Sequence, residues 1–120
     1  MKKFLLAVVF LFWSLNSQSR EWTNDEKLWA TASTAVIVAD WATTRDLTRR
    51  YNQDYYEHNP LLGKYPSTGR VDAYFALAVP INLLIADQLD DYRKHWLIGV
   101  TAVEAVLVGH NLHIGLKLQF

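Results

Sequence analysis

Three residues with carboxyl or amide side chains stand alone within otherwise apolar stretches of this chain: Asp40, Asn82 and Glu104. Such groups are costly to bury in lipid or in a protein core, so they usually mark a hydrogen-bond network, a partner or a site. Two carboxyl groups together can work as general acid and general base, or bind a hard cation. Asp40 and Glu104 are therefore candidate catalytic residues. The alternatives are a buried network that fixes helix register, or plain exposure to solvent.

Helical spacing adds two further side chains to this polar set. Thr44 follows Asp40 by four residues, so a helix would place both on one face. Asn111 follows Glu104 by seven residues and would share its face in the same way. Asn82 could meet either pair. We therefore take Thr44, Asn82 and Asn111 as candidate binding residues of a polar network.

A second candidate group lies in the segment rich in proline and glycine that comes after the first apolar stretch. Glu57 next to His58 could form a titrating pair beside the helices, and Asn59 begins an Asn-Pro turn. Glu57 and His58 join the candidate catalytic residues, and Asn59 joins the candidate binding residues. The alternative is a tight structural turn that packs onto the helix ends.

The sequence offers no recognisable metal or cofactor motif. None of its four histidines has the i, i+4 spacing around a helical Glu that zinc hydrolases use. The chain contains no Cys, which excludes disulfides and thiolate zinc sites. It also contains no nucleophile elbow, phosphate-binding loop or dinucleotide fingerprint. We expect no bound metal and no cofactor.

Residues 1–19 are typical of a signal peptide or of an uncleaved signal anchor. Lys2 and Lys3 precede an apolar run over residues 4–15, which is short for a membrane span of roughly 20 residues. Ser17 and Ser19 have the small side chains and the spacing of a signal peptidase site. Both interpretations address the chain to the export machinery.

Residues 20–120 are long enough for one domain, and their pattern predicts an all-α fold. We expect a small bundle of three hydrophobic helices behind the signal or anchor helix, with a short extended C-terminal tail. Thr23 and Glu26 have the spacing of a capping box that would open the first helix. The predicted elements are helices at about 24–51, 69–88 and 91–110, a loop at 52–68 and a tail at 111–120.

The end of the tail alternates apolar and polar side chains, which is the pattern of a β-strand. The apolar members are Ile114, Leu116, Leu118 and Phe120. A single strand cannot leave its backbone unpaired in lipid. We therefore expect the tail to pair, or to dock on another protein.

The distribution of charge predicts an orientation in a membrane. The segment 45–70 is basic, whereas the segment 87–95 is rich in Asp. Three spans behind an exported N-terminus would put the basic segment inside, as the positive-inside rule requires. Against this, an Asp at a helix centre costs about 2.5–3.5 kcal/mol, which offsets the few strongly apolar residues of the first helix. We expect the bacterial inner membrane, with a soluble periplasmic bundle as the alternative.

Three short motifs give the chain a resemblance to known proteins. They are Asp40-Trp41-x-x-Thr44, Glu57-x-Asn59-Pro60-x-Leu62-Gly63-x-x-Pro66-Ser67, and Tyr74-Phe75. In these the chain resembles a group of small bacterial and phage-borne proteins with a signal-like start and a few hydrophobic helices. The resemblance implies an architecture and no activity. It also groups Asp40, Glu57, Asn59 and Glu104 as one set.

The charge balance of the chain reduces the set of expected partners. The 12 basic and 12 acidic residues balance, which gives no reason to expect nucleic acid as a partner. We expect contact with membrane lipid, and with another envelope protein or a second copy. The predicted function is a structural or protein-interaction role in the envelope, and phage-type roles such as lysis control or superinfection exclusion suit its size by analogy alone.

Two alternatives to this function stay open. One is a small intramembrane or periplasmic hydrolase, or a metal-dependent enzyme, that uses Asp40, Glu57, His58 and Glu104. The other is a soluble periplasmic helical binding protein.

Overall fold

The computed structural model describes residues 21–48, 61–63 and 66–120, and this part of the chain is helical without any strand. Its elements are α2 (Asn24–Leu47), α3 (Thr68–Gln88), the short 3-10 helix η2 (Asp90–Tyr92) and α4 (Arg93–His113). The small bundle of three helices predicted from the sequence is confirmed. The first helix ends at Leu47 with Thr48 as its C-cap, earlier than the end near residue 51 that the sequence predicts.

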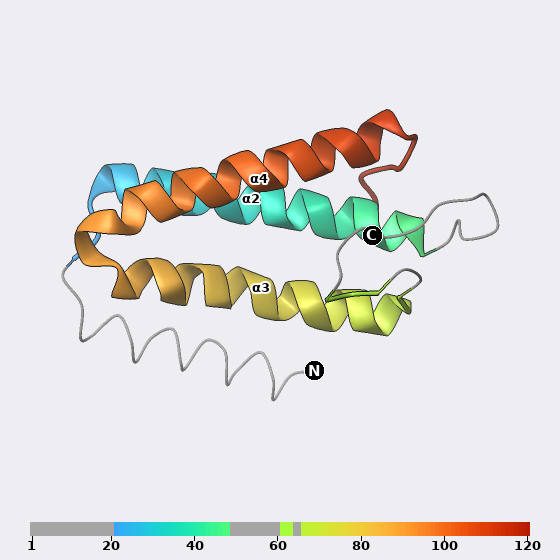
Figure 1. Cartoon of the computed structure of the whole chain (residues 1–120), viewed down its shortest axis with the longest axis horizontal. Coiled ribbons are helices and arrows are strands. Elements are labelled where there is room, and N and C mark those ends of the chain that lie inside the picture. The colour runs from blue at the N-terminus through green and yellow to red at the C-terminus, as the bar shows by residue number, and fades with distance from the viewer. Residues whose placement is uncertain (1–20, 49–60, 64–65) are drawn as a thin grey trace.

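The three helices lie side by side with alternating direction. α2 packs against both α3 and α4, and η2 connects α3 to α4 at the end of the bundle where α2 begins (Figure 1). α2 and α4 therefore run in the same direction and α3 runs against them. The C-terminus lies at the opposite end of the bundle, next to the last turns of α2 (Figure 1). Side chains from all three helices can thus meet along one interior axis.

Local sequence explains where the helices begin. The Thr23 hydroxyl accepts from the Glu26 N–H at 3.1 Å, and the Glu26 carboxylate accepts from the Thr23 N–H at 2.9 Å. This is the capping box that the sequence predicts, and it satisfies two backbone donors at the start of α2. Ser67 caps α3 by accepting from the Arg70 N–H. α3 then continues through Pro80 to its end.

The end of α4 differs from the prediction. The helix runs to His113 rather than to residue 110, so Asn111 belongs to α4 and not to the tail. A Schellman motif ends the helix: the Leu116 N–H donates to the Asn111 carbonyl, and the Gly115 N–H donates to the Leu112 carbonyl. Gly115 has φ +102° there, a conformation that residues with a Cβ rarely adopt. The sequence alternation suggests a strand from residue 114, but this turn directs the chain back toward α2.

The interior of the bundle contains both apolar and polar side chains. An apolar cluster of Ile37, Leu62, Val71 and Phe75 is buried between α2 and α3, with Trp41 packed against it. Along α2 the buried side chains recur at intervals of three, four or seven residues, which is the spacing of one helical face. The members of this stripe are Glu26, Ser33, Ile37, Asp40, Thr44 and Leu47. Four of the six are polar or charged, so the core-facing side of α2 is mostly polar.

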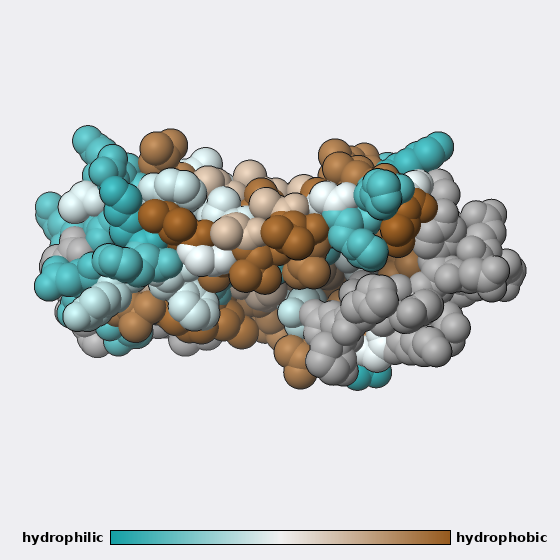
Figure 2. Space-filling model, turned by 45° about the horizontal axis from the view of Figure 1, so that its top comes forward, coloured by the Kyte–Doolittle hydropathy of each residue, from teal (hydrophilic) through white to brown (hydrophobic). Residues whose placement is uncertain are grey.

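The outer surface has the opposite character. Figure 2 shows hydrophobic side chains along the middle of one face and hydrophilic side chains gathered at the end near η2. Large apolar side chains are exposed on α3 and on α4: Leu77, Ile81 and Ile85, and Val103, Val106 and Leu107. Of the helices in the described ranges, α3 is long and apolar enough to cross a membrane, and 22% of that stretch is buried in the bundle.

Candidate functional site

Polar side chains from different helices meet at three levels along the interior of the bundle. We name each level after one of its members. The Arg93 centre comprises Trp22, Glu26, Asp87, Asp90 and Arg93; the Asn82 centre comprises Ser33, Asn82 and Trp96; and the Asp40 centre comprises Asp40, Thr43, Thr44, Glu104 and Asn111.

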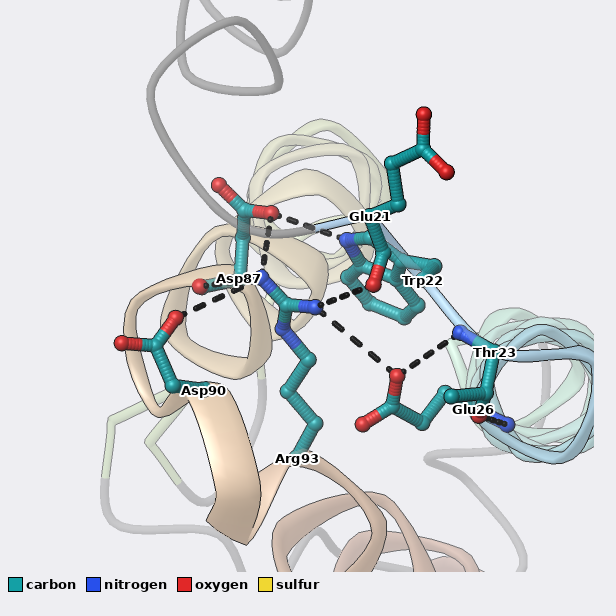
Figure 3. Close-up of polar contacts among 7 residues, drawn as sticks. All are labelled: Glu21, Trp22, Thr23, Glu26, Asp87, Asp90 and Arg93. Atoms are coloured by element: carbon teal, nitrogen blue, oxygen red, sulfur yellow. Dashed lines mark hydrogen bonds and ion pairs between the residues drawn. The ribbon is translucent and has the colours of Figure 1, made fainter.

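The Arg93 centre closes the end of the bundle at the α3–α4 connection (Figure 3). The Arg93 side chain is 0% exposed, and its Nη2 lies 3.4 Å from Asp87 Oδ1 and 3.6 Å from Asp90 Oδ1. Its Nη1 lies 3.8 Å from Glu26 Oε1, which joins α4 to the start of α2. The guanidinium group therefore links three separate segments of the chain.

Backbone and aromatic contacts complete the surroundings of this guanidinium group. Arg93 donates to the carbonyl oxygens of Asp87 at 3.0 Å and of Glu21 at 3.4 Å. The Trp22 indole N–H donates to Asp87 Oδ1 at 2.8 Å, and Arg93 lies over the Trp22 ring at 5.0 Å from its centroid. A buried charge is tolerable only where such partners compensate the loss of water. The Arg93 centre therefore has a structural role: its contacts hold the segment before α2 against the α3–α4 turn.

The Asn82 centre lies deeper in the bundle and joins all three helices through one amide. Asn82 Nδ2 on α3 donates to the Ser33 hydroxyl on α2 at 3.0 Å. Asn82 Oδ1 accepts from the Trp96 indole N–H on α4 at 2.9 Å. The Ser33 hydroxyl in turn donates to the Ala30 carbonyl at 3.0 Å. Both ends of the Asn82 amide are thus satisfied, as a buried polar group requires.

The Asp40 centre joins α2 to α4. Asp40 Oδ1 accepts from the Thr44 hydroxyl and from Asn111 Nδ2, each at 3.2 Å. Asn111 Nδ2 also donates to the Thr43 hydroxyl at 2.9 Å. The Glu104 carboxyl group of α4 lies beside the Asp40 carboxyl group and completes the centre.

A hydrogen bond between two carboxyl groups has a direct chemical consequence. Such a bond forms only where one of the two groups carries a proton, because an ionised carboxylate has no donor. Two ionised carboxylates at contact distance would also repel each other strongly in a low-dielectric interior. The structure places Asp40 and Glu104 side by side, and their general acid–base role stays a prediction.

Glu104 also borders an open groove on the surface of α4. The groove has a volume of about 400 Å³, and its described lining comprises His95, Trp96, Gly99, Val100, Val103 and Glu104. Glu104 therefore belongs both to the Asp40–Glu104 pair and to the lining of a groove that is otherwise mainly apolar. A small molecule or a side chain of a partner in this groove would lie next to the Glu104 carboxyl group.

The structure brings together four of the residues singled out in the sequence: Asp40, Thr44, Glu104 and Asn111. Asn82 meets neither carboxyl group, although the sequence leaves both contacts open, and instead forms a separate centre with Ser33 and Trp96. The remaining candidates, Glu57, His58 and Asn59, lie outside the described residues. Within the described ranges, no group of three or more His, Asp or Glu side chains is arranged to hold a metal ion.

Several members of the three centres are not identified by the sequence. Ser33 precedes Asp40 by seven residues, so the same face argument that selects Thr44 could have selected it. Trp22, Trp96 and Arg93 give no such signal, because tryptophans and charges near helix ends are typical of a solvated or interfacial surface. Asp87 and Asp90 are expected only as part of an acidic loop.

Comparison of the chain with protein-family models, with curated proteins and with solved structures finds no match. The three polar centres and the distribution of apolar surface are therefore the observations from which a function is inferred.

Proposed function

We propose that this protein is a small helical component of the bacterial inner membrane, in which polar contacts inside the bilayer hold three helices together in a structural or protein-interaction role. The observation that carries the proposal is a reversed polarity of the bundle, with polar side chains inside and apolar side chains outside. Buried polar side chains in the described ranges are as numerous as buried apolar ones, while large apolar side chains are exposed on the outer faces of α3 and α4. A soluble bundle normally shows the opposite arrangement.

The distribution of charged groups along the helices supports the same proposal. In the middle sections of the helices, residues 28–44, 73–86 and 95–112, the only Asp, Glu, Lys or Arg side chains are those of Asp40 and Glu104. These two carboxyl groups lie beside each other, with Asp40 buried and Glu104 half-buried. Charged residues elsewhere gather at the ends of the helices, as they do where headgroups and water begin.

Helix length is also suitable for a bilayer. α2 has 24 residues, and α3 and α4 have 21 each, which at about 1.5 Å per residue corresponds to roughly 31–36 Å. The hydrocarbon core of a bilayer is about 30 Å thick. By the positive-inside rule, the end with Arg45 and Arg70 would face the cytoplasm, and the end with Asp87, Asp90 and Asp91 would face the periplasm.

The polar centres are well suited to a role in assembly. Helices in lipid gain no hydrophobic driving force from packing together, so hydrogen bonds between helices and close packing hold them. Each of the three centres contains a contact between helices. Phage-type roles such as lysis control suit a membrane component of this size, by analogy alone.

A second candidate function is an intramembrane acid–base enzyme or proton carrier. The specific observation in its favour is that Glu104 both lies beside Asp40 and borders the groove on α4. Asp40→Asn and Glu104→Gln separate the two roles. If both variants reach wild-type levels and both abolish a phenotype of the protein, the site is chemical. If they unfold or deplete the protein, the centre is structural, and if they are present and active, the acid–base role is rejected.

Insertion of a charge on the outer surface tests the membrane proposal. Val106 is 71% exposed near the middle of α4, and Tyr92 is 67% exposed at its beginning. A Lys near the middle of a membrane span costs about 2.5–3.5 kcal/mol. We expect Val106→Lys to lower the amount of protein recovered in the membrane severalfold, and Tyr92→Lys to leave it unchanged.

The same pair of variants would also identify a soluble bundle. On a soluble bundle both positions are surface positions, where substitutions change stability by no more than about 0.5 kcal/mol. Equal recovery of Val106→Lys and Tyr92→Lys in the soluble fraction would reject the membrane proposal.

A further inference from the structure

The C-terminal tail docks on its own chain, at the end of the bundle that contains the Asp40 centre. The Lys117 N–H donates to Asp46 Oδ2 at 2.9 Å. Arg45 donates through Nη1 to the Phe120 carbonyl at 3.2 Å. The sequence predicts a tail that pairs or docks on another protein. The structure instead seats its last four residues on the final two turns of α2.

Aromatic contacts hold the last residue over the same turns. The Phe120 ring packs edge-on against the Trp41 ring, with centroids 5.4 Å apart. The Arg45 guanidinium group lies 5.7 Å from the centroid of the Phe120 ring. Both Trp41 and Arg45 are anchored to α3, because the Trp41 indole N–H donates to Asp72 and Arg45 Nε lies 2.9 Å from the same carboxylate. The tail therefore rests on a platform built by two helices.

One residue connects this docked tail to the Asp40 centre. The Asn111 carbonyl accepts from the Leu116 N–H in the Schellman motif, which sets the direction of the tail. The Asn111 side chain donates to Asp40 and to Thr43. Leu116 is buried at this turn. The main chain of Asn111 thus holds the beginning of the tail, and its side chain belongs to the Asp40 centre.

We propose that residues 114–120 form a strap that closes the end of the bundle over the Asp40 centre, and that release of the strap opens the Asp40–Glu104 pair to water. The strap contacts α2 at Trp41, Arg45 and Asp46, which are next to Asp40 and Thr44 in the sequence. It is held by a few polar contacts and by one ring, that of Phe120, which is 56% exposed but packs against Trp41. Such a segment can open without unfolding the helices.

The strap concerns contacts within the chain and goes beyond the proposed role in the membrane. It holds equally if the helices prove to lie outside a bilayer. Its test therefore fails or succeeds independently of the location of the protein.

Chemical labelling of carboxyl groups tests the strap on the full chain in detergent. A water-soluble carbodiimide with glycine ethyl ester labels accessible carboxyl groups, and mass spectrometry resolves Asp40 from the exposed Asp91, which serves as the internal standard. Three variants are compared with the wild type: deletion of residues 117–120, Phe120→Ala, and Leu118→Ala. Leu118 is exposed in the tail and is the matched control.

We expect labelling of Asp40, relative to Asp91, to rise severalfold in the deletion variant and less in Phe120→Ala, whose backbone carbonyl can still accept from Arg45. Leu118→Ala should label as the wild type does. Wild-type labelling of Asp40 by a deletion variant that retains the helical circular dichroism would overturn the strap. If the deletion variant loses its helical signal, Phe120→Ala decides, and an unchanged rate at Asp40 would overturn the proposal.

Discussion

Arg93 at the start of α4 lies 3.4 Å from Asp87 at the end of α3, and both side chains are excluded from solvent. The pair closes the turn between the two helices, and Arg93 also contacts Glu26 in the first turn of α2 and the Glu21 carbonyl before it. The loss of either partner from such an ionic contact lowers the stability of the fold. Without the Arg93 guanidinium group, the carboxylates around it would stay buried without a cation.

Replacement of Arg93 by Met should therefore be strongly destabilising. Loss of one partner from a buried ion pair costs about 3–5 kcal/mol. The matched control is Lys94→Ala, because Lys94 pairs with Asp25 in a contact where both side chains are largely exposed and such pairs contribute about 0–1 kcal/mol. Reversible unfolding in detergent measures both. Equal stability of the two variants would show that the Arg93 centre does not hold the bundle.

Asn82→Leu tests the centre that joins all three helices. The change removes the donor to Ser33 and the acceptor for Trp96. Because hydrogen bonds between membrane helices average about 0.6 kcal/mol each, we expect a loss of roughly 1 kcal/mol in the free energy of unfolding. Ser33→Ala removes one of the two contacts and should cost less. A variant Asn82→Leu more stable than Ser33→Ala would contradict this assignment.

Infrared spectroscopy tests the prediction that Asp40 and Glu104 share a proton. A protonated carboxyl group has a carbonyl stretch distinct from that of a carboxylate, and we expect one such band from the buried pair. Asp40→Asn and Glu104→Gln should each remove it while preserving the helical content, because the amides keep an oxygen acceptor of similar size. Asp91→Asn is the control. A spectrum in which the band is absent from the wild type would contradict the shared proton.

The sequence contains enough information to predict the helical class and part of the Asp40 centre. Helical spacing places Thr44 beside Asp40, and Glu104 and Asn111 on one face of α4, because that spacing is a property of the helix alone. The capping box of α2 is predictable for the same reason: Thr23 and Glu26 interact within one turn.

Contacts between distant segments cannot be predicted in this way. In the sequence Arg93 is one charge of an acidic loop, and nothing in its neighbourhood shows that Glu21, Glu26 and Trp22 reach it from another segment. Asn82 faces the interior but meets Ser33 and Trp96 at another level of the bundle, because the position of α3 along its neighbours depends on packing. The alternation of the tail predicts a strand, whereas Gly115 reverses the chain and the Trp41–Arg45 platform holds it.

Carbonate extraction of membranes from cells that express the full chain tests the central claim most directly. Alkaline carbonate releases soluble and peripheral proteins, whereas proteins whose helices cross the bilayer stay with the lipid. The reversed polarity of the bundle predicts that the protein remains in the membrane pellet after extraction. Release into the supernatant, together with a helical and monodisperse protein in buffer without detergent, would contradict the account.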